Sequence, residues 1–146
     1  MPTDTRVMAV DYGDVRTGIA VSDISATMVG DAWVLHEKNA ASAARTITNE
    51  AALRSVRLLV VGYPRNMDGT AGSRAVKCEQ FAELLRTQCG IEVTLWDERM
   101  TTVSAHQILS NVGKYGKKRR KQVDAVAAAL ILESYLKFMI ASEKRV

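Results

Sequence analysis

Three short apolar segments, each of strand length and each followed by polar residues, limit the folds open to this chain. They are residues 6–10 (RVMAV), 57–62 (RLLVVG) and 91–96 (IEVTLW). Segments of helical composition precede the second and the third of them, at residues 40–55 and 72–90. A strand, helix, strand order predicts parallel strands joined by crossover helices. The three strands then end along one edge of a sheet, which is where open α/β sheets bind ligands.

The other segments predict the rest of a mixed, five-stranded sheet. Residues 18–23 (GIAVSD) follow the turn-like YGDVRT and predict an antiparallel hairpin partner for the first strand. Residues 32–36 (AWVLH) predict a third strand that extends this meander, and the later strands are parallel. We expect a short helix from Thr101, a polar loop over residues 113–121 and a last helix over about 122–139.

Size and composition are typical of one compact domain spanning residues 1–146. The chain is 47% hydrophobic, and its Gly and Pro residues are scattered. The longest uninterrupted apolar run, residues 125–132, is shorter than the roughly 20 residues that cross a bilayer, and the first ten residues lack a signal-peptide pattern. We therefore expect a cytoplasmic protein. Cys78 and Cys89 are too few for a disulfide framework or a zinc site, and we expect buried thiols.

The positive charge is confined to one segment. The formal net charge is +4, from 20 basic and 16 acidic residues, but residues 114–121 hold six cations and no acid. The remainder of the chain has 14 basic against 16 acidic residues, a balance of −2. A localised run of cations is typical of a protein that binds nucleic acid, and it is also found in solvated loops.

Polar side chains that follow the three strands predict a cluster of carboxylates. Asp11 follows the first strand, Asn66 and Asp68 follow the second, and Asp97 and Glu98 follow the third. Side chains alternate along a strand, so only one of the last two faces the cluster easily, and we choose Glu98. Neighbouring carboxylates repel one another unless cations neutralise them, and oxygen ligands favour Mg²⁺ or Mn²⁺. Whether Asp97 or Asp68 assists stays open.

Asp124 can join this cluster because it lies near the predicted start of the last helix. The loop over residues 112–121 can extend about 33 Å, enough to bring the chain back to the same edge. Asp124 would then hold metal while the adjacent cations bind the phosphate backbone of a nucleic acid. These cations are Lys117, Lys118, Arg119, Arg120 and Lys121.

Each acid can also be explained by a purely structural role. Asp11 can cap a hairpin turn, and Asp97 and Glu98 can favour the dipole of the helix that follows them. Asp124 is equally well placed for a helix dipole. The two histidines show no ligand spacing, and the two tryptophans lie in predicted strands and are expected in the core. The convergence of the acids, rather than any one of them, therefore indicates a site.

Four blocks of the sequence occur in a recognisable order and cover nearly the whole chain. They are DYGDVRTGIAVSD (residues 11–23), VGYPRNMDGTAGSRA (61–75), DERMTTVSA (97–105) and VDAVAAALIL (123–132). Together they resemble the YqgF family, also called RuvX. The resemblance implies an RNase H-like α/β fold with helices on both faces of the sheet. It also implies a nuclease of precursor 16S ribosomal RNA, earlier described as a Holliday junction resolvase.

The resemblance maps the family's catalytic acids onto Asp11, Glu98 and Asp124. In the expected mechanism Asp11 bridges two divalent ions about 4 Å apart, Glu98 and Asp124 each hold one, and the ions activate water. Asn66 resembles the family's polar residue at the end of the fourth strand, where other RNase H-like nucleases carry an acid. The number of metals therefore stays open.

Further contacts to substrate are expected from Arg16, Arg65 and Asn66, in addition to the basic run. RNA and branched DNA present the same phosphates, so a Holliday junction endonuclease is an alternative, as is a factor for ribosome maturation or transcription that binds without hydrolysis.

The block DYGDVRTG also resembles sugar kinases and actin-like ATPases, but those proteins close two lobes around a nucleotide, and 146 residues supply only one. Precursor ribosomal particles are candidate partners and a membrane is not; monomer and homodimer both stay open.

Overall fold

The computed structural model describes residues 6–37, 39–100 and 119–144, with side chains for all of these except 119–124 and 143–144. In chain order, the described elements are β1 (Val7–Asp11), β2 (Thr17–Ser22), β3 (Val29–Leu35), α1 (Ala40–Leu53), β4 (Leu58–Tyr63), α2 (Ser73–Cys89), β5 (Glu92–Asp97), the 3₁₀ helix η1 (Glu98–Met100) and α4 (Arg119–Lys144). The short helix expected from Thr101 and most of the expected polar loop lie outside the described residues.

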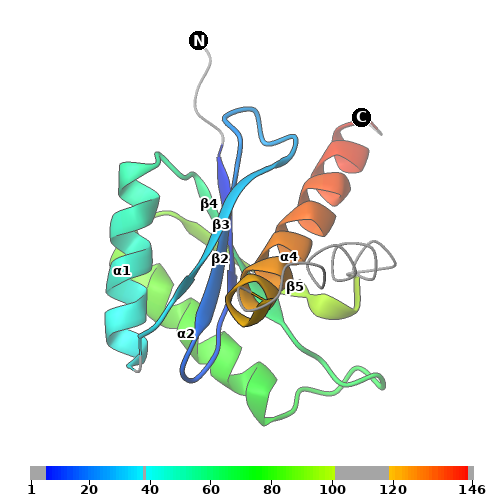
Figure 1. The fold of residues 1–146 in the computed structure, drawn as a ribbon. Coiled ribbons are helices and arrows are strands. Elements are labelled where there is room, and N and C mark those ends of the chain that lie inside the picture. The colour runs from blue at the N-terminus through cyan, green and yellow to red at the C-terminus, as the bar shows by residue number, and fades with distance from the viewer. Residues whose placement is uncertain (1–5, 38, 101–118, 145–146) are drawn as a thin grey trace.

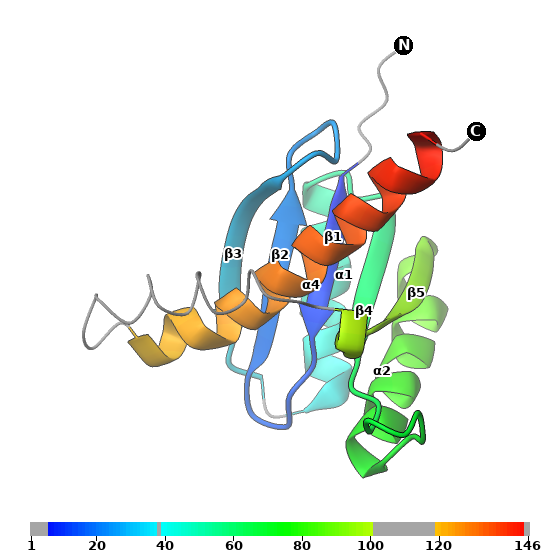
Figure 2. The ribbon, with the colours of Figure 1, turned by 90° about the vertical axis from the view of Figure 1, so that its right-hand side faces the viewer.

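The strands form one mixed sheet in the order β3-β2-β1-β4-β5 (Figures 1 and 2). β1 and β3 are antiparallel to β2, and β4 is parallel to both β1 and β5. This arrangement confirms the predicted sheet, with its antiparallel meander followed by parallel strands. The parallel strands end at the same edge, and their last residues are Asp11, Tyr63 and Asp97.

Helices cover both faces of the sheet, as predicted (Figure 1). Met8 and Val10 of β1 face α1 and α2 in one core, which also contains Cys78. Val7 and Ala9 face α4 in a second core on the other side. Because successive side chains of a strand point to opposite faces, an apolar run without alternation is what a strand covered on both sides requires.

Local chemistry sets the limits of the crossover helices. α1 begins after Asn39, whose side-chain oxygen accepts a hydrogen bond from the backbone N–H of Ala41 at 2.7 Å. α2 ends at Gly90, where φ of +69° turns the chain out of the helix, so the predicted stop is confirmed. Cys89 was expected to be buried but is only half-buried, because it is the last helical residue beside this turn.

The last helix is longer than predicted at both ends. The prediction placed Arg119, Arg120 and Lys121 in a loop, whereas the structure has them in the first turn of α4. Arg and Lys are good helix formers, and no Gly or Pro separates them from the apolar segment that follows. The window Ala125–Ser142 is long and apolar enough to cross a membrane by length and composition alone, but here its buried side chains pack on the sheet.

The β2–β3 turn is organised around Asp23. Its carboxylate accepts hydrogen bonds from the backbone N–H and the hydroxyl of Thr27, at 2.8 and 2.7 Å, from Ser25 at 2.9 Å and from the N–H of Met28 at 3.2 Å. These bonds hold the pKa of Asp23 well below its ordinary value. The stabilisation is therefore present above the ordinary carboxyl pKa and is lost as the pH falls below it.

Replacing Asp23 by Ala should lower the free energy of unfolding by about 1 kcal/mol at pH 7, because several donors lose their acceptor at a solvent-exposed turn. Urea unfolding of both proteins at pH 7 measures this difference. At pH 2 the difference should shrink, because the carboxyl group is then protonated in the unfolded chain and folding has to remove that proton to form the turn. An equal loss of stability at both values of pH would show that the turn does not depend on the charge of Asp23.

Candidate active site

The shared edge of the parallel strands brings two of the predicted acids together. Asp11 ends β1, and Glu98 follows β5 directly as the first residue of η1. Between them runs β4, where Gly62 lies next to the Glu98 carboxyl group: a Cβ on Gly62 would lie only 3.3 Å from that group. The same Cβ would lie 2.6 Å from Cδ1 of Ile131 on α4. The absence of a side chain at Gly62 therefore makes the space that Glu98 and Ile131 occupy.

The Glu98 carboxyl group has an unusual affinity for a proton. Its pKa is raised from an ordinary value of 4.5 to about 7, first by burial and second by the negative charge of Asp11. The Asp97 charge raises the pKa further, while the Arg74 guanidinium lowers it. A carboxylate in this position is short of positive charge, so it would gain from a bound cation.

Asp97 has a different environment from its neighbour. Nε of Arg99 donates to both of its carboxylate oxygens, at 3.1 and 3.0 Å, and Nη2 donates to one of them at 2.7 Å. The backbone N–H of Arg99 adds a bond of 2.9 Å, and these bonds lower the pKa of Asp97. Asp97 is therefore an ionised partner of Arg99, whereas Glu98 lies beside Asp11.

The loop between β4 and α2 uses its polar residues to fix its own shape. Oδ1 of Asp68 accepts hydrogen bonds from the N–H and the hydroxyl of Thr70, at 2.9 and 2.6 Å, which lower the pKa of Asp68. Nδ2 of Asn66 donates to the same hydroxyl at 3.0 Å. Asn66 and Asp68 therefore act at least as turn residues, and the contact of Asn66 with substrate stays a prediction.

Arg74 is a site residue that the sequence did not single out. It lies in the first turn of α2, and its Nη2 donates to the backbone oxygen of Tyr12 at 2.9 Å. Tyr12 follows Asp11 and stacks on Phe81 of α2, with ring centroids 4.0 Å apart. The Arg74 charge lowers the pKa of Glu98. A cation is thus anchored close to Glu98 and to the residue after Asp11, and only the GSRA segment at a helix start could have indicated it.

Two further arginines named from the sequence are exposed at this edge. Arg16 lies in the β1–β2 turn, and Arg65 follows β4. The Arg65 guanidinium lies 5.2 Å from the ring centroid of Tyr63, whose hydroxyl donates to Glu79 of α2. Both arginines are exposed at the edge that carries Asp11 and Glu98.

For Asp124 the structure describes only the backbone, which belongs to α4. It lies seven residues before Ile131 and therefore on the same stripe of the helix, about two turns nearer the start. Ile131 is the residue that approaches Gly62 beside Glu98. Figure 2 shows α4 crossing the sheet diagonally from its start on the β3 side. The meeting of Asp124 with the other two acids stays a prediction, because its side chain is not described.

The structure describes only the second part of the basic run over residues 117–121. Lys117 and Lys118 lie outside the described residues, while Arg119, Arg120 and Lys121 form the first turn of α4. Positive charge is unfavourable at the N-terminal end of a helix dipole. A phosphate backbone bound there would offset this repulsion.

The chemistry of the described acids fits a divalent cation. In the part of the chain whose side chains are described, no three His, Cys, Asp or Glu residues form a metal-binding group. Asp11 and Glu98 nevertheless supply carboxylate oxygens, and a cation between them would offset the burial and repulsion that raise the pKa of Glu98. Oxygen donors of this kind suit Mg²⁺ or Mn²⁺, with Asp124 as the expected third ligand.

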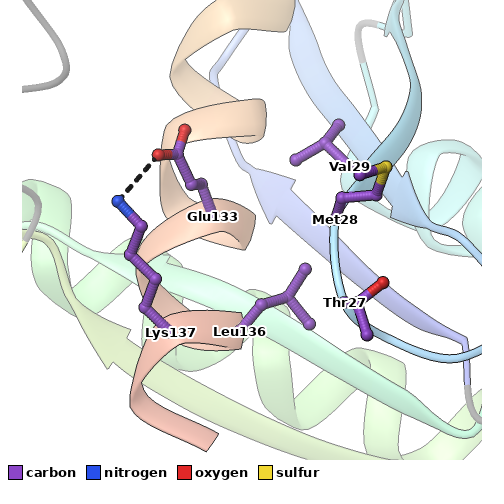
Figure 3. Close-up of a pocket in the computed structure, with 6 residues that line it drawn as sticks. All are labelled: Thr27, Met28, Val29, Glu133, Leu136 and Lys137. Atoms are coloured by element: carbon purple, nitrogen blue, oxygen red, sulfur yellow. Dashed lines mark ion pairs between the residues drawn. The ribbon is translucent and has the colours of Figure 1, made fainter. Parts of the chain in front are cut away.

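A pocket of about 290 Å³ lies away from these acids, between the β2–β3 turn and α4 (Figure 3). Met28, Val29 and Leu136 give it an apolar lining, and Glu133 and Lys137 form an ion pair of 3.0 Å at its rim. The pocket lies near the amino end of β1, opposite the edge that carries Asp11, and contributes nothing to the acid pair.

Comparisons with known proteins find relatives that share most of the chain. A family model described as "RuvX: Holliday junction resolvase" matches residues 5–138. A protein of Clostridioides difficile named "Putative pre-16S rRNA nuclease" is 37% identical over 142 residues, which cover 95% of this chain and 99% of that protein. A protein of the same name from Caldanaerobacter subterraneus is 38% identical over 132 residues, which cover 90% of this chain and 95% of that protein.

A solved structure supports the fold independently. RuvC of T. thermophilus in complex with a Holliday junction substrate superposes with a TM-score of 0.62 at 14% identity, and the match covers 92% of this chain and 96% of that one. At this low identity the likeness concerns the fold alone, and it bears out the predicted RNase H-like architecture.

Proposed function

The chain belongs to the RuvX family of Holliday junction resolvases, and from this membership we propose that it is a metal-dependent nuclease that processes the 5′ end of precursor 16S ribosomal RNA. The observation that carries the proposal is the pairing of Asp11 with a half-buried Glu98 at the carboxyl edge of the sheet. A cation would stabilise two carboxylates that repel each other in this way, and the relatives that share most of the chain are named as nucleases.

The acids of the chain would hold two divalent ions, Asp11 both of them, and Glu98 and Asp124 one each. The chemistry that such ions supply when bound is Lewis-acid activation of water and stabilisation of the leaving oxygen. Asp11 lies at the end of a central strand, and Glu98 is packed against Gly62, so their carboxylates lie on rigid elements. No side chain has to act as a nucleophile.

Phosphate binding is assigned to cations around this pair. The Arg74 charge lowers the pKa of Glu98, and its guanidinium is held at the carbonyl of Tyr12, the residue after Asp11. Arg16 and Arg65 are exposed along the same edge, and the basic run over residues 117–121 adds charge next to Asp124. These residues bind the backbone without reading bases, so shape would decide which nucleic acid is cleaved.

Replacing Arg74 by Ala should raise the KM for an RNA substrate about 10- to 100-fold, because a charge-assisted bond to phosphate contributes roughly 1.5–3 kcal/mol. The same change should raise the pKa of Glu98 in the metal-free protein, since Arg74 lowers it. Cleavage kinetics and an NMR titration of the Glu98 carboxyl group measure the two effects.

Arg45→Ala is a suitable control for Arg74, because Arg45 is exposed on α1, on a different part of the surface. Arg74→Lys keeps the charge and should recover part of the affinity. An unchanged KM together with an unchanged pKa of Glu98 would remove Arg74 from the site.

The experiment that tests the proposed function is cleavage of a panel of labelled substrates. Precursor 16S RNA, single-stranded RNA, duplex DNA and a Holliday junction are incubated with the protein in Mg²⁺, in Mn²⁺ and in EDTA. We expect cut product from the precursor RNA only with a divalent ion. Product from the junction alone would favour the DNA endonuclease that the family description names. Binding without product from any substrate would favour a non-hydrolytic factor.

The substrate determines where the protein would act and whether it would have to be a dimer. A nuclease of precursor ribosomal RNA would act in the cytoplasm on ribosomal precursor particles. A junction endonuclease would need two active sites and hence a dimer, whereas processing of one RNA end needs a single site. Light scattering of the free protein and of its nucleic-acid complex distinguishes these two states.

A further inference from the structure

The loop that follows β4 exposes a large apolar side chain at the edge of the sheet that carries the acid pair. Met67 is 92% exposed, in a loop that leaves the same edge as Asp11 and Glu98. Two more apolar side chains are exposed on neighbouring segments of this edge, Val15 at 58% in the β1–β2 turn and Met100 at 56% in η1. Figure 2 shows the β1–β2 turn and the β4–α2 loop at the same end of the sheet.

The backbone that carries Met67 is held in place from both sides. The N–H of Asn66 donates to the backbone oxygen of Thr70, and the N–H of Gly69 donates to that of Asn66, both at 2.9 Å. On the other side, Nη1 of Arg99 lies 3.5 Å from the backbone oxygen of Met67, and Asp97 fixes the same guanidinium. The exposed tip is therefore part of an ordered turn.

Folding does not explain a methionine at this position. A side chain that is 92% exposed buries almost no apolar area, so it contributes little to the free energy of folding. The polar bonds of the turn involve the backbone of residues 66–70 and the side chains of Asp68 and Thr70, and a polar residue at position 67 would leave them intact. The apolar side chain of Met67 is therefore available for contact with a partner.

The surroundings of Met67 indicate what that partner is. Arg65 lies two residues before it, and Arg74 lies in the helix that the loop enters. Proteins that distort nucleic acids combine arginines on the phosphates with apolar side chains, including Met, that insert between adjacent bases. A protein partner would need a broader apolar surface than single side chains on separate segments.

We propose that Met67 inserts into a base step of the nucleic acid next to the phosphodiester bond held at Asp11 and Glu98. The inference rests on the proposed nuclease function and adds to it a means of choosing substrates. A base step at the end of a helix, at a bulge or at a branch is already partly unstacked, so insertion costs less there than inside a regular duplex. The rigid tip thus directs the acids to irregular positions in a structured substrate.

The test measures base unstacking directly. A precursor RNA fragment carries 2-aminopurine, in turn, at each position across its junction of paired and unpaired strands, and is bound to the Asp11→Asn protein. We expect the fluorescence of at least one position to rise on binding. In the Asp11→Asn, Met67→Ala protein this rise should fall by more than about half, with the dissociation constant changed less than about fivefold, because Met67 contacts bases and not phosphates.

Two matched variants complete the experiment. Met67→Leu keeps an apolar tip and should keep the fluorescence rise. Met28→Ala removes another exposed methionine, 64% exposed at the opposite end of the sheet (Figure 3), and should change nothing. An equal rise with and without Met67, or no rise in a protein that binds the RNA, overturns the inference alone. Failure to bind RNA and junction DNA alike overturns the proposed function and the inference with it.

Discussion

Replacing Asp11 by Asn should reduce cleavage of precursor RNA by more than about 100-fold in Mg²⁺, while binding of the RNA stays equal or becomes tighter. Asn keeps the size of the side chain but removes the charge that a cation requires. Changes to residues that only orient metal ligands already cost about 10- to 100-fold, so loss of a ligand shared by two ions should cost more. Single-turnover cleavage and fluorescence anisotropy measure the two effects separately.

Binding should survive this change because Asp11 repels the phosphate that the surrounding arginines attract. Asp31→Asn is the matched control, since Asp31 lies on the exposed edge strand β3 and pairs with Arg54 at 3.7 Å, away from the acid pair. Wild-type rates of cleavage in the Asp11→Asn protein would place the active site elsewhere. Loss of both cleavage and binding would instead indicate misfolding, which urea unfolding of the variant detects.

The sheet was predictable because its signals are local. An apolar run that lacks alternation, as in VMAV of β1, is compatible with a strand covered on both faces, and the intervening helices force the later strands to be parallel. The exact limits were less predictable, since they depend on contacts distant in sequence. β4 extends one residue further than expected, to Tyr63, whose ring is buried and whose hydroxyl donates to Glu79.

The sequence predicted the acids of the candidate site but not the burial and the charges that surround them. Topology alone places the ends of β1 and β5 at one edge, which is why Asp11 and Glu98 could be named. The raised pKa of Glu98 arises from burial and from the Asp11 charge, and neither can be read from local sequence. Arg74 was missed because helical periodicity does not show which residue at a helix start reaches across to the Tyr12 carbonyl.

Replacing Glu98 by Gln should abolish cleavage and, at the same time, stabilise the metal-free protein at pH 8. The pKa of Glu98 is raised to about 7 by burial and by Asp11, so at pH 8 the fold holds a charge that it disfavours. Gln fills the same space without the charge. After allowance for the part of the group that faces solvent, we expect a gain of about 1–2 kcal/mol in the free energy of unfolding.

The dependence on pH distinguishes this effect from a general change in packing. Because the pKa is raised on folding, the folded wild type binds its proton more tightly than the unfolded chain between about pH 4.5 and 7. Its stability relative to the Glu98→Gln protein should therefore fall as the pH rises through this window and level off above it. Urea unfolding in EDTA at pH 5 and pH 8 measures the difference, and Glu92→Gln on the exposed start of β5 is the control.

Mn²⁺ at pH 8 should stabilise the wild type more than the Glu98→Gln protein, since the cation replaces the proton as the partner of the Glu98 carboxylate. A Glu98→Gln protein that is less stable than the wild type at pH 8 in EDTA would mean that the Glu98 charge already has a sufficient partner within the chain, and the acid pair would then have no need of a metal.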